Sequence, residues 1–342
     1  MEQAFQSFLS EIHWSLLTGV ILVSLLILGK AADWLISAAV SLSERSRIPK
    51  VVIGATIVSL GTTTPEVAVS VLAAVRGQSS LALGNAVGSI ICNTGLILGL
   101  SCMLDPPRIA RKIVMRQNAI QLAAVILLVL ASFPWPSAGD AFTGGGRVTQ
   151  FVAFAFLLAL AGYVWQSVQW ARERNPVSGE GQESETDSIG VIVARLAGSV
   201  ALVVVSARIL LPAVTESAVR LEVPESVIAA TLVAFGTSLP ELVVATTAAV
   251  RGHGELALGN VIGANILNVL FVVGASGAVT RGGLSADPMF FILLFPTMLL
   301  LMLTLRIGLL PGQDRLGRSY GVVMLVIYVV YTVVSYILDS GG

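Results

Sequence analysis

Two glutamates stand inside long apolar runs of this 342-residue chain, and they are its clearest candidates for chemistry. Glu66 lies in the run 51–75, and Glu241 lies in the run 227–250. A charge near the middle of a membrane helix costs about 2.5–3.5 kcal/mol on insertion scales, so it is kept where it has a function. Two carboxylates in matching settings predict one site that is assembled from two stretches of chain.

Each glutamate follows a proline and a group of hydroxyls. Residues 61–66 read Gly-Thr-Thr-Thr-Pro-Glu, and residues 236–241 read Gly-Thr-Ser-Leu-Pro-Glu. Proline lacks an amide hydrogen, so we expect the helix to open near each glycine and to free backbone carbonyls. Unwound backbone is tolerated inside a membrane where it lines a cavity or an ion site. The hydroxyls that would lie beside these carbonyls belong to Thr62, Thr63, Thr64, Thr237 and Ser238.

The donor atoms of this set are oxygens, which suits a hard cation. Ca²⁺ takes six to eight oxygen ligands, and two carboxylates neutralise its charge. Na⁺ would accept the same oxygens, whereas soft metals fit poorly because the chain has only two cysteines and two histidines. Two alternatives remain at this point. Glu66 could form a salt bridge with Lys30, and the threonines could bond back to their own helix.

A second polar pattern follows each glutamate and adds amide side chains. A spacing of four residues places each set on one helix face: Asn85, Ser89 and Asn93 in the first copy, and Asn260, Ala264 and Asn268 in the second. Asn85 and Asn260 stand near expected helix starts, where capping explains an asparagine as well as ion binding does. Asn93 and Asn268 lie about two turns deeper, and we assign them to the site. Asn265 and Cys92 are expected to pack.

The elements that must position these groups are membrane helices. Hydrophobic residues make up 55% of the chain and charged residues only 12%, against about 25% charged in soluble domains. The net charge is zero, so a nucleic-acid partner is not expected. We predict an all-α membrane protein. Ten apolar runs are long enough to cross a bilayer, at residues 16–40, 51–75, 81–104, 114–133, 148–170, 190–214, 227–250, 256–279, 289–305 and 320–338.

The chain repeats itself at an offset of 175 residues. The sequence Leu-Ala-Leu-Gly-Asn occurs at 81–85 and again at 256–260, alongside the paired Gly-Thr and Pro-Glu motifs. Each half holds five spans, and an odd number makes the second half enter the membrane from the opposite side. The repeats are therefore inverted, with the substrate site between them. We divide the chain into residues 1–170 (ion-binding motif 51–100), a polar linker 171–189 and residues 190–342 (ion-binding motif 226–275).

Loop charges predict how the chain is oriented. With ten spans, thirteen Lys and Arg side chains fall in the loops of one side and four in those of the other. The basic side should be cytoplasmic, which places the linker in the cytoplasm and both termini outside a plasma or inner membrane. Residues 1–11 lack the basic region of a signal peptide, so the first apolar run should stay in the mature chain. No cofactor and no obligate protein partner are expected.

The paired repeats SLGTTTPEVAVS…GNAVGSIICN and AFGTSLPELVVA…GNVIGANILN resemble those of the Ca²⁺/cation antiporter superfamily, and within it the prokaryotic sodium/calcium exchangers. The resemblance covers the whole ten-span layout. It implies that spans 2, 3, 7 and 8 form a core, with broken helices 2 and 7, across which long helices 1 and 6 slide. It implies Ca²⁺ ligation by Glu66 and Glu241 with the carbonyls of Thr62 and Thr237. It implies Na⁺ ligation by Ser59, Thr63, Ser89, Asn93, Ala234 (through its backbone), Ser238 and Asn268.

The chain departs from this family at two positions. The exchangers typically carry Asp where Asn268 stands and Ser where Ala264 stands. We predict a secondary antiporter that exchanges Ca²⁺ for Na⁺, with Ca²⁺/H⁺ exchange on the same fold as the alternative, because two carboxylates can trade one Ca²⁺ for two protons. A passive cation channel is a further alternative. We expect no enzyme, because neither a histidine cluster nor a nucleophile–base pair is evident.

Overall fold

The computed structural model describes residues 2–172, 188–221, 236–310 and 314–340, most of which are helical. The helices of the first half are α1 (Glu2–Glu11), α2 (Trp14–Ser46), α3 (Lys50–Ile53), α4 (Ser59–Val75), α5 (Ser79–Cys92), α6 (Gly99–Leu104), α7 (Arg111–Ser132), the 3₁₀ segment η3 (Trp135–Phe142) and α8 (Gln150–Arg172). The second half contains α9 (Ile189–Arg220), α11 (Leu239–Val250), α12 (Gly254–Leu267), α13 (Gly274–Val279), α14 (Phe295–Gly308) and α15 (Arg318–Ser340).

Several spans contain a π-helical segment, a form that often marks functional sites. These segments are η1 (Gly54–Val58) between α3 and α4, η2 (Asn93–Leu98) between α5 and α6, η5 (Asn268–Val273) between α12 and α13, and η6 (Phe290–Leu294) before α14. The irregular backbone of the second span thus lies before Gly61 rather than at it, because α4 continues through Pro65. The hydroxyl of Tyr163 on α8 supports η1 by donating to the carbonyl of Ala55 at 2.9 Å.

Nine helices of the described chain are long and apolar enough to cross a membrane, and they match nine of the ten expected spans. The seventh span is described only from Leu239 to Val250, which is apolar but has 12 residues. Such a helix is about 18 Å long, less than the roughly 30 Å hydrocarbon core. The first part of this span lies outside the described residues.

Backbone pairing between loops shows that the chain also crosses at the seventh span. Strand β1 (Gly146–Val148), between the fourth and fifth spans, pairs antiparallel with β2 (Leu284–Ala286), between the eighth and ninth. Arg108, between the third and fourth spans, pairs with Arg315, between the ninth and tenth. Paired loops lie on the same side of the membrane, so an even number of crossings separates them. That count is even only when the seventh span crosses too, which gives ten spans in two inverted five-helix repeats.

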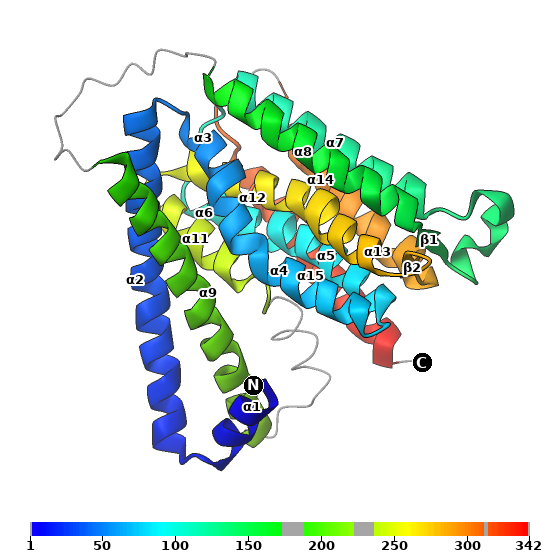
Figure 1. Ribbon diagram of the computed structural model, residues 1–342, viewed down its shortest axis with the longest axis horizontal. Coiled ribbons are helices and arrows are strands. Elements are labelled where there is room, and N and C mark those ends of the chain that lie inside the picture. Colours follow the sequence, from blue (N-terminus) through cyan, green and yellow to red (C-terminus); the bar gives the residue numbers. More distant parts are fainter. Residues whose placement is uncertain (1, 173–187, 222–235, 311–313, 341–342) are drawn as a thin grey trace.

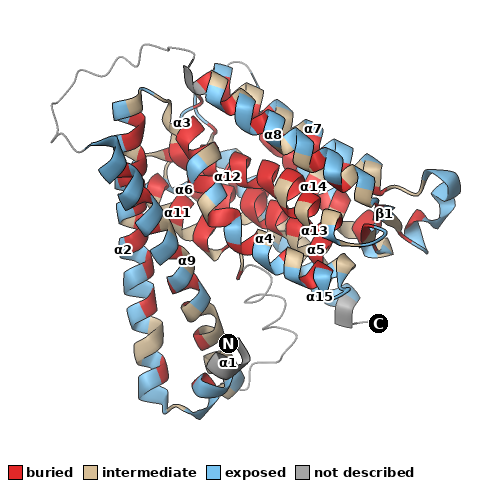
Figure 2. Ribbon diagram, viewed as in Figure 1, coloured by how far each residue is buried: buried red, intermediate tan, exposed pale blue. Residues whose placement is uncertain are grey.

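The spans that carry the two motifs form the centre of the molecule. Figure 1 shows α12 and α4 in the middle, with α7 and α8 along one edge and the long helices α2 and α9 side by side on one flank. The centre is mostly buried, whereas α2 and α9 expose much of their length (Figure 2). Glycine permits the closest approach in this core. A Cβ at Gly259 would lie 2.3 Å from the carbonyl of Val51, and one at Gly263 would lie 2.4 Å from that of Ala55.

Candidate cation site

The two glutamates lie in the core, and each is contacted by a hydroxyl of the opposite repeat. The Thr63 hydroxyl donates to Oε1 of Glu241 at 3.2 Å, and Oγ of Ser238 lies 3.4 Å from Oε1 of Glu66. Thr63 and Ser238 are 175 residues apart, as are the glutamates. The predicted repeat is therefore visible as a pair of equivalent hydrogen bonds that cross between the halves.

A second pair of crossed contacts joins hydroxyls to asparagines. Oγ1 of Thr62 lies 3.5 Å from Oδ1 of Asn260, and the Thr237 hydroxyl donates to Oδ1 of Asn85 at 3.2 Å. Asn85 and Asn260 stand in the interior of α5 and α12, whose N-caps are Gln78 and His253. Capping is thus excluded as the role of these two asparagines, which instead connect the repeats.

The deeper asparagines lie where the helix changes its form. Asn93 is the first residue of η2, and Asn268 is the first residue of η5. Both side chains are 1% exposed, and Oδ1 of each has no hydrogen-bond donor. Amide oxygens are common ligands of Ca²⁺ and other hard cations. The sequence indicated these two residues, but it did not indicate the π-helices that begin at them.

Asn265 connects the halves instead of merely packing, so the expectation for this residue was wrong. It donates to Oγ1 of Thr94 at 2.8 Å, and its Oδ1 accepts a hydrogen bond from Asn93 at 3.2 Å. The equivalent position of the first repeat is Ile90. The repeat comparison, which pairs an amide with an aliphatic side chain here, was the signal that could have identified it. Cys92, by contrast, is buried and free, as expected of a packing residue.

The carboxylates are almost fully withdrawn from solvent. Glu66 and Glu241 are each 1% exposed, and Oε2 of each has no hydrogen-bond donor. Glu66 forms no ion pair with any described residue, and the ammonium of Lys30 instead lies over the ring of Trp34, 5.9 Å from its centroid. The salt-bridge alternative is thereby excluded for Glu66. Burying an ionised carboxylate without a charged partner is costly, so the pair requires either a bound cation or protons.

The remaining predicted residues differ in what they contact. Thr64 is exposed and bonds back to the carbonyl of Leu60, and the Thr62 hydroxyl also lies 3.3 Å from the carbonyl of Ser59. The back-bonding alternative therefore holds for these two threonines and not for Thr63. Ser89 is buried 3.2 Å from the hydroxyl of Ser238 and joins the crossed network. Ser59 is buried, and its hydroxyl donates to the carbonyl of Thr56 in η1. Ala234 lies outside the described residues.

A further group of buried amides lies on α7 and was missed by the sequence reasoning. Gln117, Asn118 and Gln121 are each at most 1% exposed. Gln121 donates to the sulfur of Met302 at 3.0 Å, whereas both amide atoms of Gln117 and Oδ1 of Asn118 have no partner. Their spacing on one face of an apolar helix was the available signal. Among the described residues, no hydrogen bond connects them to the glutamates.

The site as a whole offers oxygens and little else. Its potential ligands are carboxylate, amide, hydroxyl and backbone oxygens, the donor set that hard cations prefer. Within the described ranges, no group of three or more His, Cys, Asp or Glu side chains could hold a metal ion. The geometry therefore suits a cation held by two carboxylates and neutral oxygens, and hydrogen bonds join each glutamate to a hydroxyl of the opposite repeat.

Comparison with known proteins places this geometry in a family. The family described as "Sodium/calcium exchanger protein" matches residues 16–169 and 191–337. Sodium/calcium exchanger MaX1 of Methanosarcina acetivorans is 31% identical over 93% of this chain and 97% of its own length. Inner membrane protein YrbG of Escherichia coli is 31% identical over 95% and 98%. The structure of the sodium-calcium exchanger NCX_Mj aligns with a TM-score of 0.77 and 26% identity, covering 92% of this chain and 97% of that one.

Proposed function

The chain belongs to the sodium/calcium exchanger protein family and is a Ca²⁺/cation exchanger, and we propose that it exchanges Ca²⁺ for Na⁺ by alternating access. One observation carries the proposal. Within the two repeated motifs, four buried carboxylate and amide oxygens lack hydrogen-bond donors, namely Oε2 of Glu66 and Glu241 and Oδ1 of Asn93 and Asn268. The members of each pair are 175 residues apart. Such an arrangement suits a cation that is held between the two repeats and released from either side.

We propose Glu66 and Glu241, with the carbonyls of Thr62 and Thr237, as ligands of the transported Ca²⁺. One divalent cation neutralises two carboxylates, which offsets most of the cost of burying them. Amide, hydroxyl and water oxygens can complete a shell of six to eight ligands. Because two empty carboxylates would carry unpaired charge through the membrane, only a loaded site lets the long helices move.

The hydroxyls and amides around the glutamates support Na⁺ as the counter-ion. The groups we assign to Na⁺ are Ser59, Thr63, Ser89, Asn93, Ser238 and Asn268, together with the backbone of Ala234. Two of the similar proteins, MaX1 and NCX_Mj, are named as sodium/calcium exchangers. Na⁺ accepts hard oxygen ligands, and the crossed hydroxyls place such ligands next to both carboxylates.

Exchange of Ca²⁺ for H⁺ is the second candidate, and one residue favours it. Asn268 stands where an aspartate would add a third carboxylate. Two carboxylates can exchange one Ca²⁺ for two protons with no further acid. A passive channel is disfavoured, because the cation oxygens are enclosed between helices and 1% exposed at Glu66 and Glu241.

The proposed motion uses α2 and α9, which contain 33 and 32 residues. Helices of this length measure about 50 Å and are longer than the roughly 30 Å hydrocarbon core. They lie side by side on the flank of the core (Figure 1). We propose that they slide as a pair across it, and that the basic loops face the cytoplasm and leave both termini outside.

Uptake into proteoliposomes tests the coupling. Vesicles loaded with Na⁺ are diluted into Na⁺-free buffer containing radioactive Ca²⁺, and a parallel set carries a pH gradient with Na⁺ absent. We expect uptake with the Na⁺ gradient and none with the pH gradient alone. Uptake driven by the pH gradient alone would identify the counter-ion as H⁺ and contradict our choice.

Two controls separate the carrier from a channel and from a leak. Ca²⁺ on the far side of the membrane should accelerate tracer exchange, because a carrier returns faster when it is loaded. A channel gives no such acceleration. The variant with both Glu66→Gln and Glu241→Gln should lose uptake and Ca²⁺ binding. Retention of Ca²⁺ binding by this variant in detergent would show that the two carboxylates are not the ligands.

A further inference from the structure

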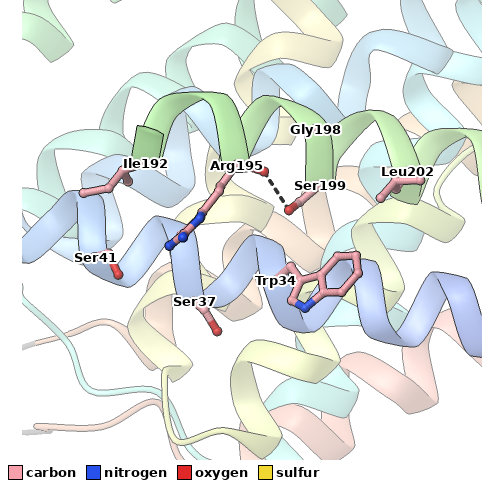
Figure 3. A pocket seen from close by; sticks show the side chains of 9 residues that line it. Trp34, Ser37, Ser41, Ile192, Arg195, Gly198, Ser199 and Leu202 are labelled. Carbon is pink, nitrogen blue, oxygen red and sulfur yellow. Dashed lines mark hydrogen bonds between the residues drawn. The ribbon is translucent and has the colours of Figure 1, made fainter. Parts of the chain in front are cut away.

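A groove lies between α2 and α9, away from the cation site. Its volume is about 560 Å³, and its lining includes Trp34, Ser37 and Ser41 from α2 and Arg195, Gly198 and Leu202 from α9. None of these residues belongs to the candidate cation site. Figure 3 shows the two helices forming the opposite walls, with side chains of both directed into the space between them. Any molecule bound in this groove would therefore be distinct from the transported ions.

The groove opens away from the protein core. Trp34 is 51% exposed and Leu202 is 38% exposed, and Ser37, Ser41 and Arg195 are exposed as well. The neighbouring outward surface of α2 is apolar, with Leu22, Val23, Leu25, Leu26 and Ile27 exposed. A helix surface of this kind in a membrane-spanning chain faces lipid. A lipid molecule is thus the component that reaches the mouth of the groove.

The polar side chains of the groove lie toward one end, which Ile192 also lines, and the other end is apolar. Arg195 extends toward α2 on the side nearest Ser41, whereas Trp34 and Leu202 lie toward the other end (Figure 3). Arg251 lies beside the groove and donates to the hydroxyl of Ser37 at 3.0 Å, but its charge is paired with Asp33 at 2.9 Å, and the Ser37 hydroxyl itself donates to the carbonyl of Asp33. Guanidinium groups and hydroxyls together are the donors that recognise phosphate.

The direction of this polarity matches that of a phospholipid. Arg195 lies near the start of α9 at Ile189, and Ser41 lies near the end of α2 at Ser46, so the polar end faces the loops. Leu202 is seven residues further along α9, about 10 Å deeper, and Trp34 is likewise deeper on α2. A headgroup at the helix ends with an acyl chain directed toward the membrane centre follows the same order.

We propose that this groove binds an anionic phospholipid, with its phosphate between Arg195 and the Ser41 hydroxyl and an acyl chain against Trp34 and Leu202. The lipid contacts both long helices at once and so couples their movement to the composition of the bilayer. Anionic lipids are abundant in the cytoplasmic leaflet, which is the leaflet that the basic loops indicate for this end. The assignment does not depend on the identity of the counter-ion.

Direct lipid binding tests the proposal. The purified chain in detergent is titrated with phosphatidylglycerol or phosphatidylcholine, and bound lipid is counted by native mass spectrometry. Two variants alter different properties of the groove. Arg195→Gln removes the charge, and Gly198→Leu fills the space, because no described atom lies within 4 Å of a Cβ at Gly198. Arg195→Gln should weaken phosphatidylglycerol binding about fivefold, the factor that about 1 kcal/mol per basic side chain gives, and Gly198→Leu should weaken it because the added side chain occupies the groove.

Matched variants outside the groove serve as controls. Arg318→Gln removes an exposed arginine at the start of α15, and Gly162→Leu adds the same side chain at a glycine of α8 that also has no described atom within 4 Å of its Cβ. Both should bind phosphatidylglycerol like the parent chain, and all four variants should still bind Ca²⁺. Equal binding of phosphatidylcholine, unchanged binding by both groove variants, or displacement of the lipid by inorganic phosphate would overturn the proposal.

Discussion

The two repeats contribute equivalent hydrogen bonds to the cation site, but they differ in several of the side chains that surround it. Both repeats direct a hydroxyl at the opposite glutamate and another at the opposite asparagine, through Thr63 and Thr62 in one half and Ser238 and Thr237 in the other. Because these contacts obey the 175-residue offset, the carboxylate pair sits on the approximate two-fold axis. A site on that axis presents similar ligands to both sides of the membrane, as alternating access requires.

The differences concentrate on the third span of each repeat and its surroundings. The first half has Ser70 and Ser89 where the second has alanines, and Asn85 donates to Ser70 at 2.9 Å. The equivalent donor, Nδ2 of Asn260, has no partner. Conversely, the second half has Asn265 where the first has Ile90. The shared groups suit the ion that needs both carboxylates, and the unshared groups suit an ion that is bound to one side of the axis.

Neutralising either glutamate should have the largest effect and tests whether the two halves are equivalent. We expect Glu66→Gln and Glu241→Gln each to weaken Ca²⁺ binding more than about 100-fold, the factor for a loss of about 3 kcal/mol when one member of a buried charged pair is removed. Isothermal titration calorimetry in detergent measures the affinity. Glu255→Gln on α12, outside the site, is the matched control. Near-normal binding by one of the two glutamine variants would break the symmetry that we infer.

The second largest effect should be a loss of stability when Asn265 is replaced by isoleucine, the residue type at the equivalent position of the first repeat. The change leaves Nδ2 of Asn93 and Oγ1 of Thr94 without their partners, and each buried unsatisfied polar group costs about 1–3 kcal/mol. Thermal unfolding can be followed with a thiol-reactive dye, because Cys92 and Cys102 are both buried and free.

A double-mutant cycle with Thr94→Val separates the lost hydrogen bond from altered packing. The effects of Asn265→Ile and Thr94→Val should be less than additive, since each variant breaks the same contact. Strict additivity would show that the contact between Asn265 and Thr94 does not contribute to stability.

Much of the site could be predicted because the repeated motifs contain residue types that are uncommon in apolar membrane helices. Matching Pro-Glu and Gly-Asn pairs at one offset indicated Glu66 and Glu241 as partners, and a spacing of eight residues from each Gly-Asn motif indicated Asn93 and Asn268. The span order and the inverted repeat followed from counting apolar runs. These features depend on periodicity and on the thickness of the bilayer, which a single sequence records.

Other features depend on three-dimensional contacts that the sequence does not record. A π-helical turn such as η1 holds one extra residue and rotates every residue after it, so it decides that Thr63 faces Glu241 while Thr64 faces outward. Its placement rests partly on Tyr163, which is 108 residues from Ala55. For the same reason the sequence placed the irregular backbone at Gly61, and it gave Asn265 no partner.

Substitutions at Ser89 of the third span and Ala264 of the eighth span should change the affinity for Na⁺ moderately and leave the affinity for Ca²⁺ unchanged. Ser89→Ala removes the hydroxyl that lies 3.2 Å from Ser238, a loss of about 1 kcal/mol and hence about fivefold in the Na⁺ concentration for half-maximal exchange. Ala264→Ser should shift that concentration in the opposite direction. Both are read from Na⁺-dependent Ca²⁺ efflux. A larger change in Ca²⁺ affinity than in Na⁺ affinity would show that the unshared groups serve Ca²⁺.

The smallest expected effect is on stability, and it involves a loop position that is titratable in the second repeat but not in the first. His253 caps α12, whereas the equivalent cap of α5 is Gln78. Partial burial, followed by the charges of Lys50 and Arg251, lowers the pKa of His253 from its ordinary value of 6.5, against an opposing contribution from Glu44. The Nζ of Lys50 lies 3.5 Å from its Nδ1, a contact that the neutral imidazole accepts.

Acidification should therefore cost a little stability through His253, and His253→Gln should remove that cost. The unfolded chain binds the proton more readily than the folded one, so the contribution is complete above about pH 6.5 and is lost as the pH falls below it. We expect less than about 0.5 kcal/mol, because the imidazole is only partly buried and solvent screens the charges around it. The measurement compares unfolding temperatures at pH 7.5 and 5.5 in the parent and the variant, so that titration of the glutamates, common to both, cancels. A larger fall in the variant than in the parent would reverse the sign and show that protonated His253 is the stabilising form, held by Glu44 against its basic neighbours.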